Sequence, residues 1–266
     1  MKKRKRWCLA VLFLLAFFCL AMPVSAAKKK GMSFDKYLKK GKNYTILVYN
    51  CVQDPLYVRT KKSQKASVMC RLNYGDAVIV DKKKLRKKKR YQWIPVTIQT
   101  SSSASKTGYI YARKVQVKKA KLAALKTGTF SSNRTIDRAI KYGMRYLGTP
   151  FLLPGSSMSS GIDCASFVVQ CYAAAGKPTS YPHTDYLQGI SRPISKGQLK
   201  AGDLIFYRKY DPCEGVIDHV AIYMGGGFIL NASGHYGDRY PNGGICIKRI
   251  NYGRRIAAMY KRINGF

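Results

Sequence analysis

The chain has 266 residues, with 49 Lys or Arg against 12 Asp or Glu and a formal net charge of +37. This length allows one medium and one small domain, each with a buried core, and the charge predicts a polyanionic partner such as a wall polymer, an anionic lipid or extracellular DNA. A sequence-specific nucleic-acid reader is not predicted, because the chain has no zinc-finger spacing and no sheet motif that interleaves aromatic and basic residues.

Residues 1–26 have the three parts of an export signal. Residues 2–6 are basic, residues 7–22 are apolar, and residues 24–26 form a small-residue cleavage site. Pro23 and the cleavage site favour removal of this segment over its retention as a membrane anchor. We therefore expect a secreted protein without a retained transmembrane helix.

Short β-type runs separated by turns follow a basic spacer at residues 27–43. They predict a small all-β barrel over residues 44–118. The expected strands cover residues 44–49, 56–59, 77–80, 93–98 and 109–117. The barrel resembles a bacterial SH3-like wall-binding domain through the segments LYVRT, YGDAVIV, WIPV and GYIYARKV, in this order.

Eight of the nine residues in the run KKKLRKKKR, residues 82–90, are basic. The run lies between two expected strands, so we expect an exposed loop tip. Two interpretations stay open, a solvated charge run and a contact for anionic wall polymers.

A linker at residues 119–134 is predicted before a second domain at residues 135–266. Apolar residues from Ile136 to Leu147 recur at helical spacing, and Gly148 ends the pattern. This amphipathic helix is expected to be structural.

A second helical pattern starts at Cys164 and stops at Gly176. Asp163 is its expected N-cap, which places Cys164 in the first turn. There the unpaired backbone N–H groups and the helix dipole favour a thiolate, so the sequence predicts a lowered pKa and a nucleophilic Cys164. Its backbone N–H is a natural oxyanion donor. Cys171, two turns deeper, is expected to be a small buried apolar residue.

His219 opens a strand-like segment that a Gly-Gly-Gly connection joins to the next one. Alternation places His219 and Ala221 on one face. With a three-residue loop Asn231 lies opposite Ala221, on the His219 face, whereas a two-residue loop turns Asn231 away. On the His219 face its amide can hold one imidazole nitrogen and aim the other at Cys164, as in papain-like enzymes.

The second domain resembles the NlpC-type (NlpC/P-sixty) cell-wall cysteine peptidases across residues 135–266, through the segments LGTPFLLPGSSMSSGIDCASFVVQCY, AGDLIFY and DHVAIYMGGGFILNAS. The resemblance implies an α+β, papain-like fold with Cys164 as nucleophile, His219 as base and Asn231 as the residue that orients the base. It also implies a wall-associated thiol protease, without a cofactor, that hydrolyses an amide of the peptidoglycan stem peptide between D-glutamate and the diamino acid through a thioester acyl-enzyme. An SH3-like domain before such a peptidase is familiar in this family.

Four residues near the nucleophile are the expected substrate contacts: Phe151, Asp163, Ala165 and Ser166. Three positions depart from the family pattern. Ala165 and Ser166 replace the usual serine and glycine, so a substrate hydrogen bond is missing or moved. Phe151 stands where a tyrosine is common and has no hydroxyl for the thiolate or oxyanion. Asn231 replaces the commoner histidine.

The remaining polar residues are ambiguous. Asp218 is expected to be a solvent-exposed acid, and His183 and His235 lie in turn-like segments as substrate-side or incidental residues. Cys213 and Cys246 are buried thiols or a disulfide pair. The chain has no C-x-x-C or H-E-x-x-H motif and its three histidines are scattered, so no metal site is predicted.

Three functions stay open at this point. The first is a peptidoglycan hydrolase, with stem peptides and anionic wall polymers as partners. The second is a wall-binding protein with an inactive peptidase domain. The third is a thiol acyltransferase, because an acyl-enzyme can be captured by a nucleophile other than water.

Overall fold

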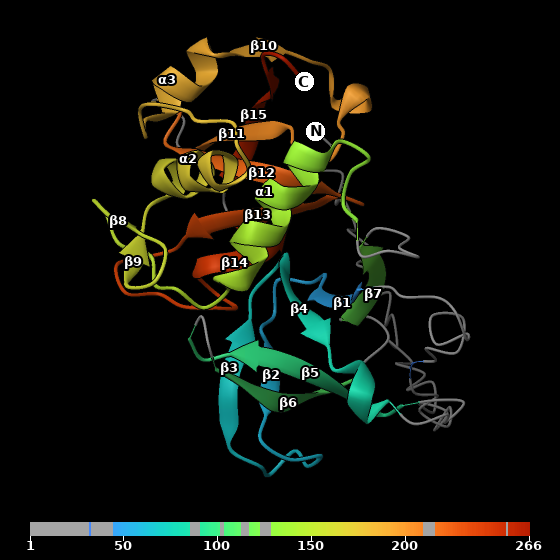
Figure 1. Ribbon diagram of the computed structural model, residues 1–266. Coiled ribbons are helices and arrows are strands. Elements are labelled where there is room, and N and C mark those ends of the chain that lie inside the picture. Colours follow the sequence, from blue (N-terminus) through green and yellow to red (C-terminus); the bar gives the residue numbers. More distant parts are fainter. Residues whose placement is uncertain are drawn as a thin grey trace, which may run out of the picture. The chain divides into compact units, whose positions relative to one another are not determined.

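Figure 1 shows the computed structural model, which describes residue 32 and residues 45–85, 91–101, 104–112, 117–122, 129–209, 216–253 and 255–266. All of them belong to the unit Gly31–Phe266. The expected export signal, most of the basic spacer and residues 86–90 of the basic run lie outside the described residues. Within the described segments no helix is long and apolar enough to cross a membrane.

The N-terminal part covers residues 45–122, and its described residues form strands and one short 3-10 turn. The elements are β1 (Thr45–Asn50), β2 (Leu56–Arg59), β3 (Val68–Leu72), β4 (Asp76–Val80), η2 (Lys82–Lys84), β5 (Trp93–Gln99), β6 (Ser105–Tyr111) and β7 (Val117–Leu122). All neighbouring strands are antiparallel, in the order β7-β1-β4-β5-β6-β2-β3. The predicted all-β composition of this part is confirmed, whereas its SH3-like identity stays a prediction.

Two elements of this part differ from the sequence expectation. Strand β3 was not expected, because only Leu72 at its end is fully buried and the strand has no clear alternation. The expected strand at residues 109–117 is two strands, β6 and β7, and β7 runs to Leu122, into the segment predicted as a linker. There it pairs along the whole of β1.

Buried and exposed side chains alternate along strand β2 of this part, as expected for β-structure. In β2, Leu56 and Val58 are buried while Tyr57 between them is exposed. Gly108 of β6 allows the sheet to close over Val58, because a Cβ at Gly108 would lie 2.3 Å from Val58 Cγ1.

The C-terminal part is α+β, as predicted. Its elements are α1 (Arg134–Arg145), β8 (Ser156–Ser157), β9 (Gly161–Ile162), α2 (Cys164–Ala174), α3 (Thr184–Gly189), β10 (Ser191–Pro193), η3 (Lys196–Gln198), β11 (Leu204–Lys209), β12 (His219–Gly225), β13 (Phe228–Ser233), β14 (Gly244–Arg249) and β15 (Arg255–Ile263). The sheet order is β10-β15-β11-β12-β13-β14. Helices α1 and α2 lie together against this sheet (Figure 1).

The two faces of this sheet carry separate apolar clusters. The cluster shared with α1 and α2 includes Phe206, Val220 and Leu230. The other cluster contains Ile205, Tyr207, Ala221, Ile229, Ile250 and Tyr252. Alternation along β11 and β12 produces this division, and it places His219 with the second cluster.

The two parts share one sheet, because β14 pairs with β4 of the N-terminal part. At this junction the ammonium of Lys248 forms an ion pair with Asp76, and their side chains are 6% and 2% exposed. Asn242 Nδ2 also donates to Asp76, at 2.9 Å. Strand pairing therefore joins the two parts in addition to the segment predicted as a linker.

Candidate active site

Cys164 is the first residue of α2, as the sequence predicts. The Asp163 side chain caps this helix, since its Oδ1 accepts the Ser166 N–H at 2.8 Å. A short acidic side chain at this position satisfies one of the N–H groups that the first turn leaves unpaired. The cap fixes the place where α2 starts and hence the position of the thiol.

The Cys164 thiol lies in a nearly closed environment, with the residue 9% exposed. Burial raises the pKa of Cys164 to about 11, against the opposing effect of hydrogen bonds from the backbone N–H groups of Val220 and Ala165. The predicted lowering of this pKa is therefore wrong, because desolvation outweighs the helix terminus. The bond from Val220 also places the sulfur at the start of β12, at the residue that follows His219 in the chain.

His219 and Asn231 are hydrogen-bonded, with 3.1 Å between His219 Nε2 and Asn231 Oδ1. Asn231 Nδ2 donates to the Cys246 carbonyl oxygen at 3.1 Å, which fixes the orientation of the amide. The amide oxygen can only accept, so Nε2 carries the hydrogen in the neutral imidazole. In this tautomer Nδ1 carries a free lone pair and is the basic atom of the ring.

A β-bulge sets the register that brings these two side chains together. Tyr223 pairs with Ile229 and Gly225 pairs with Phe228, so residue 224 is an extra residue on β12. Only two residues, both glycines with positive φ, form the turn. Of the two loop lengths considered, the structure has the two-residue loop, and the bulge restores the parity that places Asn231 on the His219 face.

Burial is also the main influence on the base. His219 is 2% exposed and its pKa lies well below 6.5, first because of desolvation and then because of the charges of Arg255 and Lys248, against the hydrogen bond to Asn231. The imidazole is therefore neutral at pH 7 and able to accept a proton. A neutral thiol and a neutral imidazole form the resting state of the site.

The expected substrate contacts have well-defined places. Asp163 Oδ2 accepts from Ser166 Oγ at 3.0 Å and from the Gly155 N–H at 3.2 Å. Ser166 and Ala165 are 4% and 5% exposed, and Phe151 is partly buried. Asp163 and Ser166 thus stabilise the start of α2, and a substrate role for all four residues stays a prediction.

Asp218 and His183 have partners of their own. Asp218 forms a partly buried ion pair with Arg255, so the expectation of a simple solvated acid is corrected. His183 caps α3 through Nδ1, which accepts the Asp185 N–H at 3.3 Å, and His235 has an exposed side chain.

The structure shows the state of two cysteines that the sequence left open or predicted to be buried. Cys171 and Cys246 are buried free thiols, as predicted for Cys171, and Cys213 lies outside the described residues. In the portion of the chain that the structure describes, no three His, Cys, Asp or Glu side chains are grouped to hold a metal ion.

Sequence reasoning missed three residues around His219: Tyr207, Tyr252 and Arg255. The Tyr207 and Tyr252 rings lie 5.7 and 6.5 Å from the imidazole, centroid to centroid. Alternation along β11 places Tyr207 across from His219, but no local pattern indicates Tyr252 or Arg255. Their positions depend on the fold of the chain after β14.

Part of the chain matches a known protein family. Residues 148–252 match the NlpC/P60 family. The chain is 34% identical over 99 residues to the bifunctional muramidase/DL-endopeptidase CwlT of Bacillus subtilis, covering 36% of this chain and 29% of that protein. It is 33% identical over 98 residues to the gamma-D-glutamyl-L-lysine dipeptidyl-peptidase of Bacillus subtilis, with coverages of 37% and 32%.

A third similar protein is the murein DD-endopeptidase MepH of Escherichia coli, 31% identical over 121 residues, with 43% of this chain and 44% of that protein covered. The chain thus spans less than half the length of each of these relatives. Residues 148–252 nevertheless form a domain of the NlpC/P60 family, and the relatives of the chain are named as cell-wall peptidases.

Proposed function

We propose that this protein is an exported cysteine endopeptidase that hydrolyses the stem peptide of peptidoglycan. The observation that carries the proposal is the hydrogen bond from His219 Nε2 to Asn231, next to a thiol bonded by the Val220 N–H. A base held through one nitrogen, beside a cysteine at a helix N-terminus, is the arrangement that nucleophilic catalysis needs.

The chemistry follows from the two neutral groups. Nδ1 of His219 takes the proton of the Cys164 thiol as the sulfur attacks the scissile carbonyl carbon. The imidazolium then gives the proton to the leaving amine, and a thioester remains on Cys164. A water molecule, deprotonated by His219, hydrolyses this thioester and regenerates the thiol. Asn231 keeps Nε2 bonded through every step.

The scissile bond that we propose joins D-glutamate and the diamino acid. One relative is named as a gamma-D-glutamyl-L-lysine dipeptidyl-peptidase and another as a DL-endopeptidase, which supports this choice. The DD-endopeptidase among the relatives indicates the alternative bond to examine.

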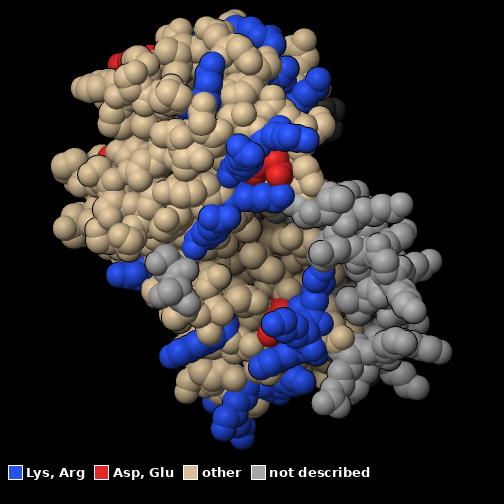
Figure 2. Space-filling model, in the orientation of Figure 1, with Lys and Arg blue, Asp and Glu red and all other residues tan. Residues whose placement is uncertain are grey.

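The N-terminal part is proposed to hold the enzyme on the wall through charge. Figure 2 shows Lys and Arg side chains spread over this face of the molecule, with few Asp or Glu. Exposed lysines of the N-terminal part are Lys61, Lys62, Lys65, Lys83, Lys84, Lys106 and Lys118. They complement anionic wall polymers.

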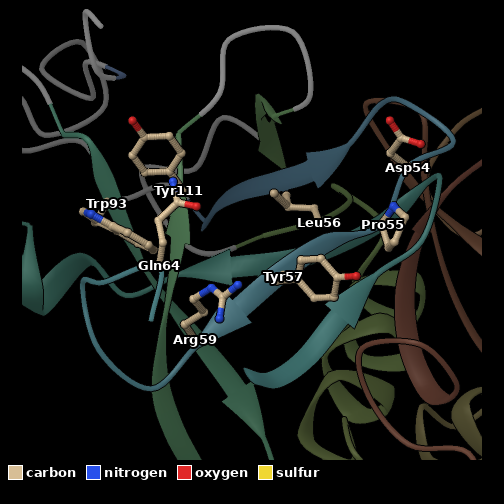
Figure 3. Close-up of a pocket in the computed structure, with 8 residues that line it drawn as sticks. All are labelled: Asp54, Pro55, Leu56, Tyr57, Arg59, Gln64, Trp93 and Tyr111. Atoms are coloured by element: carbon tan, nitrogen blue, oxygen red, sulfur yellow. The ribbon is translucent and has the colours of Figure 1, made fainter. Parts of the chain in front are cut away.

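A groove in the N-terminal part is the proposed contact with uncharged wall material. It is lined by Asp54, Pro55, Leu56, Tyr57, Arg59, Gln64, Trp93 and Tyr111 (Figure 3). The rings of Trp93 and Tyr111 lie 5.1 Å apart. Aromatic rings with a few polar groups are typical of a ligand groove.

The catalytic proposal is tested by incubating the protein with purified peptidoglycan and analysing the soluble fragments by mass spectrometry. We expect new stem-peptide fragments from the wild type and none from Cys164→Ala. Equal release by both would show that the thiol does no chemistry and that the domain only binds the wall. Transfer of the acyl group to an added amine instead of water would identify an acyltransferase.

Wall retention is tested separately, by sedimentation with purified walls at increasing salt. Retention is expected to fall with salt and to weaken when the basic residues of residues 82–90 are replaced by Gln. Trp93→Ala is expected to weaken retention at every salt concentration. Retention that is unchanged by the Gln replacements and by Trp93→Ala would contradict the proposed roles of the basic residues and of the groove.

A further inference from the structure

Tyr252 lies over the catalytic base. Its ring is 6.5 Å from the His219 ring in an edge-on arrangement at 72°, and 5.6 Å from the Tyr207 ring at 67°. The residue is 7% exposed. It follows β14 in the chain, so the loop between β14 and β15 places an aromatic side chain on the face of the sheet that carries His219.

The Tyr252 hydroxyl is buried and has no hydrogen-bond partner. The neighbouring Tyr207 hydroxyl, by contrast, donates to the Ile250 carbonyl oxygen at 2.9 Å. A buried hydroxyl without a partner costs free energy, and native structures keep few of them. An unused donor on a ring that lies next to the candidate base is available for a bound substrate.

Cys164 is one of the groups that influence this hydroxyl. Burial raises the pKa of Tyr252 well above its ordinary value, Arg255 lowers it, and Cys246, Cys164 and Asp218 raise it. The hydroxyl thus stays protonated and can donate. The Lys248 ammonium lies 5.3 Å from the centre of the ring, on the side of the N-terminal part.

The turn between β3 and β4 of the N-terminal part packs against Tyr252. Gly75 has φ +85°, and a Cβ there would lie 2.6 Å from Tyr252 Cβ. The Gly75 carbonyl oxygen accepts the Arg249 N–H at 2.7 Å, and the Tyr74 carbonyl oxygen accepts the Gly253 N–H at 3.4 Å. The backbone on both sides of Tyr252 is therefore held by the turn between β3 and β4.

We propose that Tyr252 is a catalytic residue whose hydroxyl donates a hydrogen bond to the carbonyl oxygen of the scissile amide. This inference rests on the endopeptidase activity proposed above. As the Cys164 sulfur bonds to the carbonyl carbon, the π electron pair moves to the oxygen and the thiol proton moves to His219 Nδ1. Tyr252 keeps its own proton and stabilises the oxyanion.

The test compares the full-length wild type, Tyr252→Phe and Tyr240→Phe on purified peptidoglycan fragments. Tyr252→Phe removes one hydroxyl and keeps the ring, and loss of one oxyanion donor is expected to lower kcat by roughly 100-fold with little change in KM. Tyr240→Phe is the matched control, because Tyr240 is also buried but its hydroxyl already has a partner, the Ile79 N–H of the N-terminal part. Its kcat is expected to stay near that of the wild type.

Alkylation of Cys164 by iodoacetamide supplies a readout that does not depend on hydrolysis. Alkylation builds no oxyanion, so Tyr252→Phe is expected to alkylate at the rate of the wild type. An unchanged kcat in Tyr252→Phe overturns the inference. A parallel loss of kcat and of the alkylation rate also overturns the inference. Such a loss would mean that Tyr252 positions Cys164 and His219 and does not stabilise the oxyanion. A wild type that releases no more fragments than Cys164→Ala overturns the proposed function, and this inference with it.

Discussion

His219 and Asn231 are twelve residues apart in the sequence, and a 3.1 Å hydrogen bond joins their side chains because one extra residue in β12 corrects the register of the hairpin between them. A two-residue turn alone would place the amide on the opposite face of the sheet. The glycines at 225, 226 and 227 all have positive φ, which permits both the bulge and the turn.

The first prediction concerns the Asn231 amide. Asn231→Ala is expected to lower kcat by roughly 100-fold, because the imidazole loses the partner that fixes its tautomer and aim. The variant also leaves the Cys246 carbonyl oxygen without its donor, which should lower the free energy of unfolding by about 1–3 kcal/mol. Steady-state kinetics and denaturant unfolding measure the two effects.

Ser233→Ala is the matched control for Asn231→Ala. Ser233 lies two residues further along β13, is also buried, and contacts the Cys246 sulfur at 3.6 Å. The Asn231 amide, and not the Ser233 hydroxyl, is the hydrogen-bond partner of His219, so kcat of Ser233→Ala should stay near that of the wild type. Equal losses of kcat in the two variants would show that general damage to β13, and not the amide, lowers the activity.

The second prediction concerns the pH dependence of the thiol. Because burial raises the pKa of Cys164 from 9.0 to about 11, its alkylation rate should rise about tenfold per pH unit from neutral pH to about pH 10. Mass spectrometry of the Cys164 peptide measures this rate. A flat rate between about pH 5 and pH 8 would instead indicate a stable thiolate–imidazolium pair.

The same burial predicts the acid limb of hydrolysis. A base whose pKa lies well below 6.5 is still unprotonated in mildly acidic solution. The acid limb of kcat/KM should therefore have its midpoint below that of an ordinary histidine. A midpoint at or above 6.5 would contradict the assignment of buried His219 as the base.

Local sequence patterns were sufficient to predict the helix and the strand that carry Cys164 and His219. The cap at Asp163 and the alternation at His219 depend on neighbouring residues, so α2 and β12 begin where the sequence indicates. The thiol pKa depends on how completely the fold covers Cys164. The helix terminus is visible in the sequence, but the desolvation that outweighs it is not.

Contacts between distant segments could not be predicted in the same way. The pairing of β14 with β4 joins residues about 170 positions apart, and the Lys248–Asp76 ion pair is part of it. From the sequence alone, Gly75 is predicted only to be a turn residue. Its closeness to Tyr252 depends on how the two parts of the chain meet, for which a single sequence carries no local pattern.

The third prediction concerns the ion pair at this junction. Lys248→Met leaves the buried Asp76 carboxylate without its ammonium, and the free energy of unfolding should fall by about 3–5 kcal/mol. The control is Lys141→Met, which breaks a 2.6 Å ion pair with Asp137 on α1 in which the lysine side chain is 41% exposed. That change should cost less than about 1 kcal/mol. Similar losses in denaturant unfolding would mean that the junction pair is not effectively desolvated.

The last prediction separates the steric role of Gly75 from its backbone conformation. Gly75→Ala and Gly176→Ala both introduce a Cβ at φ +85°, but nothing lies within 4 Å of a Cβ at Gly176. Each should therefore lose about 1–2 kcal/mol of stability from the left-handed conformation. Only Gly75→Ala should lose more, because its Cβ meets Tyr252 Cβ.

Activity distinguishes the two glycine variants further. A displaced Tyr252 no longer lies over His219, so Gly75→Ala should lower kcat even at temperatures where it stays folded, while Gly176→Ala should keep the kcat of the wild type. The measurement is kcat at a temperature well below both unfolding midpoints. If folded Gly75→Ala retains full kcat, the turn between β3 and β4 does not position the catalytic face, and the N-terminal part serves the enzyme only in stability and wall binding.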